Sequence, residues 1–293
     1  MFIDIHAHVR IFDSPSSPDD YGSLFCTPVQ LREKLEPFGV NKAIVLPCVT
    51  PDCSWGIQSN EEILWGIREH ADFFVPFMNL DPRMGSNSPQ SNLGYFMDHY
   101  KAQGCRGIGE ITANLPFDDP LMENLFHHAE LKQLPVIFHI APSHYGYYGI
   151  RDGLHLPGLE GALQKFPNLI FIGHSQPFWA EIGGDLTAEQ RNSYPTGPVA
   201  EGGTLVRLLR SYPNLWADLS AGSGFNAVSR DPEFGFHFFD EFQDRLMFGT
   251  DVCDIRNEVK LPDYLKTSLA ANKISQSVFN KIAHENAHRL LNL

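Results

Sequence analysis

Eight short runs of apolar, β-branched or aromatic residues alternate along the chain with segments that carry helix start and stop signals. This alternation is typical of repeated βα units in a parallel sheet. Several runs are apolar at nearly every position, as expected of strands that are covered on both faces. The predicted strands are residues 2–8, 42–48, 73–79, 106–111, 136–140, 169–174, 215–219 and 246–250.

The segments between these runs contain residues that begin and end helices. Thr27, followed by Pro28 and Gln30, forms a capping box, and Gly39 can end that helix. Asp119 before Pro120 predicts the start of another helix. Further helices are predicted at residues 60–70, 89–103, 157–166, 202–211, 232–242 and 262–271, and at the C-terminus.

Eight strands that are each followed by a helix close most economically into a (β/α)8 barrel, and 293 residues suit one such domain. The predicted fold is therefore α/β, a TIM barrel that forms a single domain over residues 1–293. We expect longer loops after strands 1, 5, 6 and 7 to distort it. No change of composition and no linker divides the chain.

The charge of the chain limits what it can bind. The 35 Asp and Glu against 22 Lys and Arg give a net charge of −13 without a basic cluster, so we expect neither nucleic acid nor membrane as a partner. Five cysteines without a C-x-x-C pair and a start without a signal-peptide pattern favour a reducing cytoplasm. A homo-oligomer remains open.

Residues of metal-ligand type stand at the ends of five predicted strands. Because active sites of such barrels lie at the carboxyl ends of the strands, these side chains should meet there. His6 and His8 are two residues apart, so both imidazoles should point to the same side of the first strand. The full set is His6, His8, Glu110, His139, His174 and Asp251.

Three or four imidazoles with one or two carboxylates suit Zn²⁺, and Mn²⁺, Fe²⁺ or Co²⁺ also use such ligands. Taken singly, each residue has a structural explanation: Asp251 can cap a following helix, and Glu110 can pair with Arg106. Five strands that carry such residues at the same end favour one joint explanation. The sequence predicts a centre for one or two divalent ions.

The segments around these residues resemble the metal-dependent amidohydrolase superfamily, specifically its amidohydrolase-related group, amidohydrolase 2. The matching segments are residues 2–8, 107–111, 135–139, 171–174, 246–251 and 285–291. The core metal ligands that the resemblance implies are His6, His8, His139 and Asp251. Glu110 matches a position that bridges two metals in binuclear relatives, and His174 matches one that binds a second metal in some relatives and is catalytic in others.

The resemblance also implies a reaction. A divalent metal lowers the pKa of a water that it binds from about 15.7 toward about 7, and it polarises the oxygen under attack. Asp251 accepts the proton of the water and passes it to the leaving group, while His174 can stabilise an oxyanion. The predicted function is hydrolysis of an amide, lactone or ester bond in a small-molecule substrate.

Two other functions are compatible with the same residues. One is a metal-dependent decarboxylase similar to aminocarboxymuconate semialdehyde decarboxylase, which uses one metal and the strand-six histidine. The presence of Glu110 favours hydrolysis over this reaction. The other is a barrel that keeps the ligands without turnover.

Two arginines are predicted to receive an anionic group of the substrate. Arg10 and Arg151 follow the first and fifth predicted strands, and a guanidinium can bind a carboxylate through two hydrogen bonds. The alternative is that each arginine pairs with a neighbouring acid, Asp13 or Asp152.

The loops offer further candidate contacts. His144 and Tyr145 lie in the aromatic, glycine-containing loop 143–149, which can form a wall of the substrate pocket. Trp179 belongs to the stretch 177–203, which can form a lid or a subunit interface. The loop 14–20 is rich in turn formers and predicts a flap.

Overall fold

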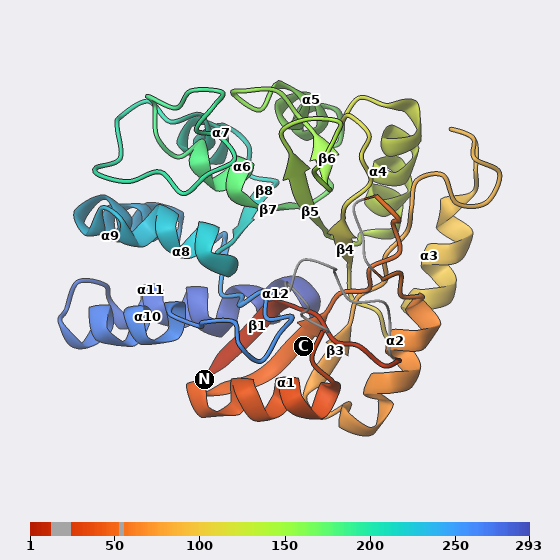
Figure 1. Cartoon of the computed structure of the whole chain (residues 1–293), viewed down its shortest axis with the longest axis horizontal. Helices are drawn as coiled ribbons and strands as arrows, with labels where there is room; N and C mark the ends of the chain where they lie inside the picture. Colours follow the sequence, from red (N-terminus) through yellow and green to blue (C-terminus); the bar gives the residue numbers. More distant parts are fainter. Residues whose placement is uncertain (13–24, 53–55) are drawn as a thin grey trace.

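The computed structural model describes residues 1–12, 25–52 and 56–293 (Figure 1). Within these residues, eight parallel strands follow one another around a barrel, in two sheets of order β1-β2-β3 and β4-β5-β7-β8-β9. They are β1 (Phe2–Ala7), β2 (Val40–Val45), β3 (Phe74–Pro76), β4 (Ile108–Ile111), β5 (Val136–Ala141), β7 (Phe171–His174), β8 (Leu215–Asp218) and β9 (Leu246–Met247).

Backbone hydrogen bonds join the two sheets at both seams. Between β3 and β4, the N–H of Met78 donates to the carbonyl of Gly107 at 3.0 Å. Between β9 and β1, the N–H of Asp251 donates to the carbonyl of His6 at 2.7 Å. The predicted (β/α)8 barrel is confirmed, and its second seam holds two of the predicted metal ligands side by side.

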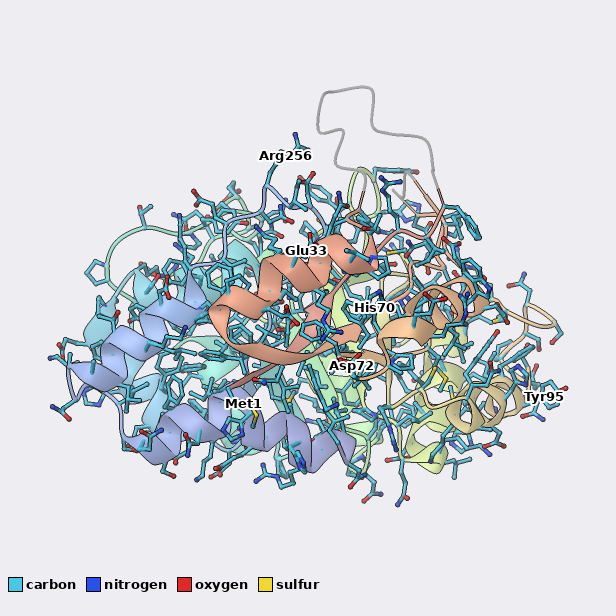
Figure 2. The ribbon with its side chains drawn as sticks, turned by 90° about the horizontal axis from the view of Figure 1, so that it is seen from below. Met1, Glu33, His70, Asp72, Tyr95 and Arg256 are labelled. Atoms are coloured by element: carbon cyan, nitrogen blue, oxygen red, sulfur yellow. The ribbon has the colours of Figure 1, made fainter. Side chains whose placement is uncertain are left out.

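Helices cover the outside of the strands (Figure 1). They are α1 (Pro28–Leu35), α2 (Asn60–Ile67), α3 (Leu93–Ala102), α4 (Pro120–Lys132), α5 (Pro157–Lys165), α7 (Thr204–Ser211), α9 (Pro232–Phe242) and α10 (Leu261–Ala270), with the short helices η1 (Glu36–Phe38) and η2 (Arg68–His70). The predicted capping box at Thr27 and Gln30 is present, and Asp119 caps α4. Exposed side chains such as Glu33 and Tyr95 lie on this outer layer (Figure 2).

The C-terminal segment packs against the barrel strands. It consists of α11 (Gln276–Asn280), the π-helix η3 (Lys281–Glu285) and α12 (Asn286–Leu291). Ala287 and Leu291 of α12 join a buried apolar cluster with strand side chains, among them Ile5 and Met247. None of the described helices is both long enough and apolar enough to span a bilayer.

Three elements were not predicted from the sequence, and each follows a strand after which a longer loop was expected. They are β6 (Ile150–Arg151), α6 (Gln176–Ala180) and α8 (Ala221–Ser229). The segment of α8 contains Gly222 and Gly224, which disfavour a helix when considered locally. Tertiary packing of α8 against α6 and α9 overrides that preference.

Candidate metal centre

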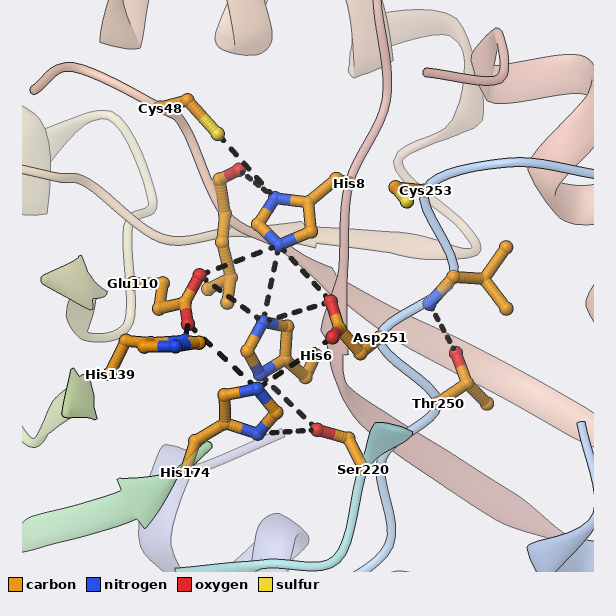
Figure 3. Close-up of polar contacts among 12 residues, drawn as sticks. His6, His8, Cys48, Glu110, His139, His174, Ser220, Thr250, Asp251 and Cys253 are labelled. Carbon is orange, nitrogen blue, oxygen red and sulfur yellow. Dashed lines mark hydrogen bonds and ion pairs between the residues drawn. The ribbon is translucent and has the colours of Figure 1, made fainter. Parts of the chain in front are cut away.

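The six predicted ligands meet at the carboxyl ends of their strands and point toward one another (Figure 3). β1 and the residue after it supply two histidines, β4, β5 and β7 supply one residue each, and one follows β9. These are His6, His8, Glu110, His139, His174 and Asp251. Five are buried, whereas the Asp251 side chain is 28% exposed. Asp251 is therefore the member that a substrate can approach from solvent.

Imidazole nitrogens and carboxylate oxygens surround one point beside β1. The Nε2 atoms of His6 and His8 are 3.2 Å apart, and each lies 3.5 Å from Oδ1 of Asp251. Oε2 of Glu110 is 3.8 Å from both nitrogens. Two nitrogens about 2.1 Å from a single Zn²⁺ can be separated by such a distance. The geometry of this first group fits one divalent ion.

The other oxygen of Glu110 faces a second pair of histidines. Its Oε1 lies 2.7 Å from Nδ1 of His139 and 3.9 Å from Nε2 of His174. Oδ2 of Asp251 is 3.7 Å from the same nitrogen of His174. Glu110 thus turns one oxygen toward each group, as a ligand shared by two ions does.

Gly109 permits the position of Glu110. Its φ is 146°, and a Cβ at this position would lie 2.6 Å from the carbonyl oxygen of Ile137 on β5. A larger residue would therefore separate β4 from β5. Glycine brings the following carboxylate within reach of His139.

The far nitrogens of the first two histidines are hydrogen-bonded to acceptors. Nδ1 of His6 lies 2.6 Å from Oδ2 of Asp218, and Nδ1 of His8 lies 3.0 Å from the carbonyl oxygen of Leu46. Because both acceptors require an N–H, each Nδ1 carries the proton and Nε2 is left for a metal.

The charges around the centre favour a cation. Burial by itself lowers the pKa of His6, but the carboxylates of Asp251 and Asp218 overcome it and raise this pKa to about 10, so a metal that binds Nε2 must displace a proton from it. Burial would raise the pKa of Glu110, yet His139 and His6 hold it well below its usual range. Burial lowers the pKa of His8, which keeps its imidazole in the neutral form that binds metals. The donor set and its charge therefore suit a divalent transition metal.

Sequence reasoning missed Asp218 and Ser220. Both are buried at the end of β8, and the Ser220 hydroxyl lies 2.9 Å from Nδ1 of His174. The two residues are separated by one position at the carboxyl end of a predicted strand, as His6 and His8 are. The same alternation rule applied to strand seven would have found them.

Asp4 was also missed, although it lies two residues before His6. Its carboxylate accepts the backbone N–H of His6 at 3.0 Å, the N–H of Thr250 at 2.9 Å and the Thr250 hydroxyl at 2.6 Å. Burial raises the pKa of Asp4 to about 7, against the effect of these hydrogen bonds. The contacts join β1 to the segment that carries Asp251.

Of the aromatic loop 143–149, Tyr148 reaches closest to the centre. Its ring centroid lies 4.2 Å from that of His139. Partial burial of the Tyr148 side chain, which is 43% exposed, together with the carboxylates of Glu110 and Asp251, raises the pKa of Tyr148 above its ordinary value. The phenol therefore keeps its proton and can donate a hydrogen bond.

The two loop residues predicted to contact substrate lie further out. Tyr145 is 83% exposed and packs on His144 with ring centroids 4.6 Å apart. Nδ1 of His144 lies 3.1 Å from Oδ1 of Asn114. These contacts hold the two rings on the surface of the loop.

Trp179 lies in the hydrophobic core and not at the site. Its side chain is 2% exposed, and its ring packs against Phe178 and Phe238. Its indole N–H donates to the carbonyl of Asp218 at 2.9 Å. We therefore assign this ring to packing beneath the metal centre. The first residues of the predicted lid, 177–180, form part of α6 and are buried in the hydrophobic core.

One of the two arginines predicted to bind the substrate anion, Arg151, already has a hydrogen-bond partner within the protein. Nε of Arg151 donates to the carbonyl of Asn114 at 3.2 Å. The carboxylate of Asp152 accepts the backbone N–H groups of Gly158 and Leu159 at 2.9 Å. Arg10 is half-buried just after β1. Its alternative partner, Asp13, and the expected flap at 14–20 lie outside the described residues.

Two of the clefts in the described part of the chain lie among these loops. The larger, about 590 Å³, is lined by His144 and Arg151 together with residues of α4 and α5. The smaller, about 300 Å³, borders Thr250, directly before Asp251, and is also lined by Arg230. Each cleft is lined by a guanidinium, that of Arg151 on β6 in the larger and that of Arg230 at the end of α8 in the smaller.

Comparisons with known proteins place the chain in a family. No curated protein sequence matched it. A probable 2-pyrone-4,6-dicarboxylic acid hydrolase from Acinetobacter baumannii, solved with citric acid bound, superposes with a TM-score of 0.64 at 16% identity, over 100% of this chain and 99% of that one. An amidohydrolase from Burkholderia multivorans with bound zinc gives 0.65 at 15% identity over the same shares.

A third similar structure is that of a decarboxylase and not of a hydrolase. The 5-carboxyvanillate decarboxylase from Sphingomonas paucimobilis superposes with a TM-score of 0.60 at 14% identity, over 100% of this chain and 99% of that one. At these identities the likeness shows the barrel fold alone. The profile of the amidohydrolase family, however, matches residues 3–293, and by this match the chain belongs to the amidohydrolase family.

Proposed function

We propose that this protein is a metal-dependent hydrolase that cleaves an amide, lactone or ester bond in a small, anionic organic molecule. The observation that carries the proposal is the carboxylate of Asp251. It lies within 3.7 Å of His6, His8 and His174, and it is the exposed member of an otherwise buried ligand set. A proton acceptor beside a metal centre and open to solvent is what hydrolysis requires.

The centre would hold one or two ions. His6, His8 and Asp251 would bind the first, His139 and His174 the second, and Glu110 both. When bound, the ion supplies Lewis acidity, which acidifies a water and polarises the substrate oxygen. Zn²⁺ suits these ligands best, with Mn²⁺, Fe²⁺ or Co²⁺ as alternatives. The zinc found in the Burkholderia multivorans amidohydrolase supports the first choice.

The side chains of this protein then move the protons. Asp251 accepts a proton from the attacking water, whose oxygen forms the new bond to the carbonyl carbon. The same carboxyl group returns this proton to the leaving nitrogen or oxygen as the old bond breaks. If a single ion is bound, His174 is free to stabilise the negative oxygen. The phenol of Tyr148, whose ring packs on His139, offers a second donor.

Replacing Glu110 with Gln should reduce the number of ions bound per chain. The amide keeps one oxygen and directs N–H groups at one of the two histidine pairs, so one group loses its shared ligand. Elemental analysis of protein loaded with Zn²⁺ measures the change, and Glu123→Gln on α4 is the control on the outer layer. Equal stoichiometry in wild type and Glu110→Gln would contradict the shared role.

Replacing Arg10 or Arg151 with Met should raise KM for an anionic substrate far more than for its neutral ester. A charged hydrogen bond contributes about 1.5–3 kcal/mol, which corresponds to roughly 10- to 100-fold in KM. Arg32→Met on α1, which removes two ion pairs with Glu36 and Asp72, is the control. Equal changes for acid and ester would show that neither arginine receives the anion.

A substrate panel tests the proposed reaction. Protein loaded with Zn²⁺ is incubated with lactones, N-acyl compounds, esters and aromatic acids, and both acid release and CO₂ release are followed. Hydrolysis that depends on the ion supports the proposal. Release of CO₂ from an aromatic acid without hydrolysis would overturn it in favour of a decarboxylase, the reaction of the Sphingomonas paucimobilis neighbour.

A further inference from the structure

Behind the candidate metal centre, one carboxylate contacts a histidine from each ligand group. Oδ2 of Asp218 lies 2.6 Å from Nδ1 of His6 and 3.3 Å from Nδ1 of His174. Both nitrogens are on the side of the ring opposite the Nε2 atoms that face the centre. His6 belongs to the group around β1 and His174 to the group that includes His139, and both also face Asp251.

Ser220 completes the link between this carboxylate and His174. Its hydroxyl donates to Oδ2 of Asp218 at 2.8 Å and can accept the N–H of His174 Nδ1 at 2.9 Å. The same hydroxyl is 3.5 Å from Nδ1 of His6. Asp218 and Ser220 are wholly buried, so water does not replace these contacts.

We propose that Asp218 and Ser220 act as one positioning pair that fixes the protonated nitrogen of His6 and of His174 together. The inference rests on the proposed metal centre. Both histidines keep the proton on Nδ1 because the acceptors lie there, and both present a bare Nε2 to the metal side. The two ligand groups therefore depend on one carboxylate and should weaken together when it is changed.

The second oxygen of Asp218, Oδ1, determines how the side-chain amide would be oriented if Asp218 were replaced with Asn. Oδ1 accepts the backbone N–H of Ser220 at 2.9 Å. In Asp218→Asn the amide oxygen must stay on that N–H, so the NH₂ group takes the place of Oδ2. It then points a donor at Nδ1 of His6, which favours the tautomer with the proton on Nε2. That tautomer cannot bind a metal through Nε2.

The variants Asp218→Asn and Asp218→Ala should show an unusual order of metal affinity. Asp218→Ala removes the acceptor but places no donor against His6, so His6 keeps access to the productive tautomer. Asp218→Asn, closer in shape to the wild type, should bind the metal more weakly than Asp218→Ala. A role in packing alone predicts the reverse, because Ala leaves a cavity and Asn does not.

The test measures metal binding and not turnover. Zn²⁺ affinity is measured by competition with a chelator, and the visible absorption of the Co²⁺-loaded protein reports ligand geometry. Changes behind a metal ligand typically cost about 10- to 100-fold in metal affinity. We expect Asp218→Asn to lie in that range with an altered Co²⁺ spectrum, Asp218→Ala to lose less, and Ser220→Ala to lose least.

Asn214→Ala is the matched control. Asn214 is buried just before the opposite end of β8, where its amide donates to the carbonyls of Leu163 and Phe166 at 3.1 Å. This variant should lose thermal stability and keep both the affinity and the spectrum. It separates general damage to β8 from an effect on the ligands.

Wild-type affinity and spectrum in Asp218→Asn would overturn the proposal, as would weaker binding by Asp218→Ala than by Asp218→Asn. If thermal unfolding shows that Asp218→Ala does not fold, the comparison of Asp218→Asn with wild type decides. If wild type binds metal but hydrolyses nothing, the proposed reaction fails while this test stands. If wild type binds no metal, the proposed centre itself fails.

Discussion

Replacing Asp251 with Asn should lower kcat by roughly 100-fold or more while most of the metal stays bound. The amide keeps one oxygen near His6 and His8, so a ligand atom remains. It has no lone pair basic enough to accept the proton of the attacking water. The loss should therefore appear in kcat and leave metal content nearly unchanged, and steady-state kinetics with elemental analysis of the same sample measures both.

Asp254→Asn on the same loop is the control. Asp254 is a carboxylate three residues further along whose ion pair is with Arg256 at 2.6 Å. This variant should keep near-wild-type turnover, because its carboxylate has no contact with the ligand set. Near-wild-type turnover in Asp251→Asn as well would show that another group transfers the proton.

Removing the metal should abolish activity, and adding Zn²⁺ or Mn²⁺ should restore it. The ligand set holds the negative charge of Glu110, Asp251 and the adjacent Asp218 close together, and an ion neutralises it. An ion present at about 1,000 times its Kd stabilises the folded state by about 4 kcal/mol. Chelation should therefore lower both turnover and the melting temperature, measured by kinetics and thermal unfolding.

When metal is added back, the dependence of the two recoveries on metal concentration is also informative. Recovery of the melting temperature and of turnover should follow the same dependence on metal concentration, because one centre accounts for both. Full turnover in protein shown by elemental analysis to be free of metal would contradict the assignment.

The ligand types could be predicted from the sequence because each stands where a strand ends. The i, i+2 spacing of His6 and His8 alone predicts a shared direction, and their Nε2 atoms are 3.2 Å apart. The single-residue alternatives do not hold: Glu110 contacts His139, not Arg106, and the helix after Asp251 begins only at Leu261, with Lys260 at its N-cap position. The local sequence pattern was sufficient to predict ligand positions where the backbone forms a regular strand.

Other features depend on contacts between distant segments and had no local signal. Asp251 has a φ of 55° after β9, which ends at Met247, so its side chain is not aimed by strand geometry. The division of the two oxygens of Glu110 depends on the position of β4, from which one oxygen faces His6 and His8 and the other faces His139 on β5. Trp179 looked like a loop aromatic, because nothing around it in the sequence shows that α6 is buried.

Elemental analysis of the protein purified without chelators shows most directly whether the metal centre exists. We predict at least one tightly held divalent transition metal per chain, and its loss in a variant that replaces both His6 and His8 with Ala. Wild-type protein that carries no metal and takes up none from added Zn²⁺ or Mn²⁺ would show that these strand ends do not form a metal centre.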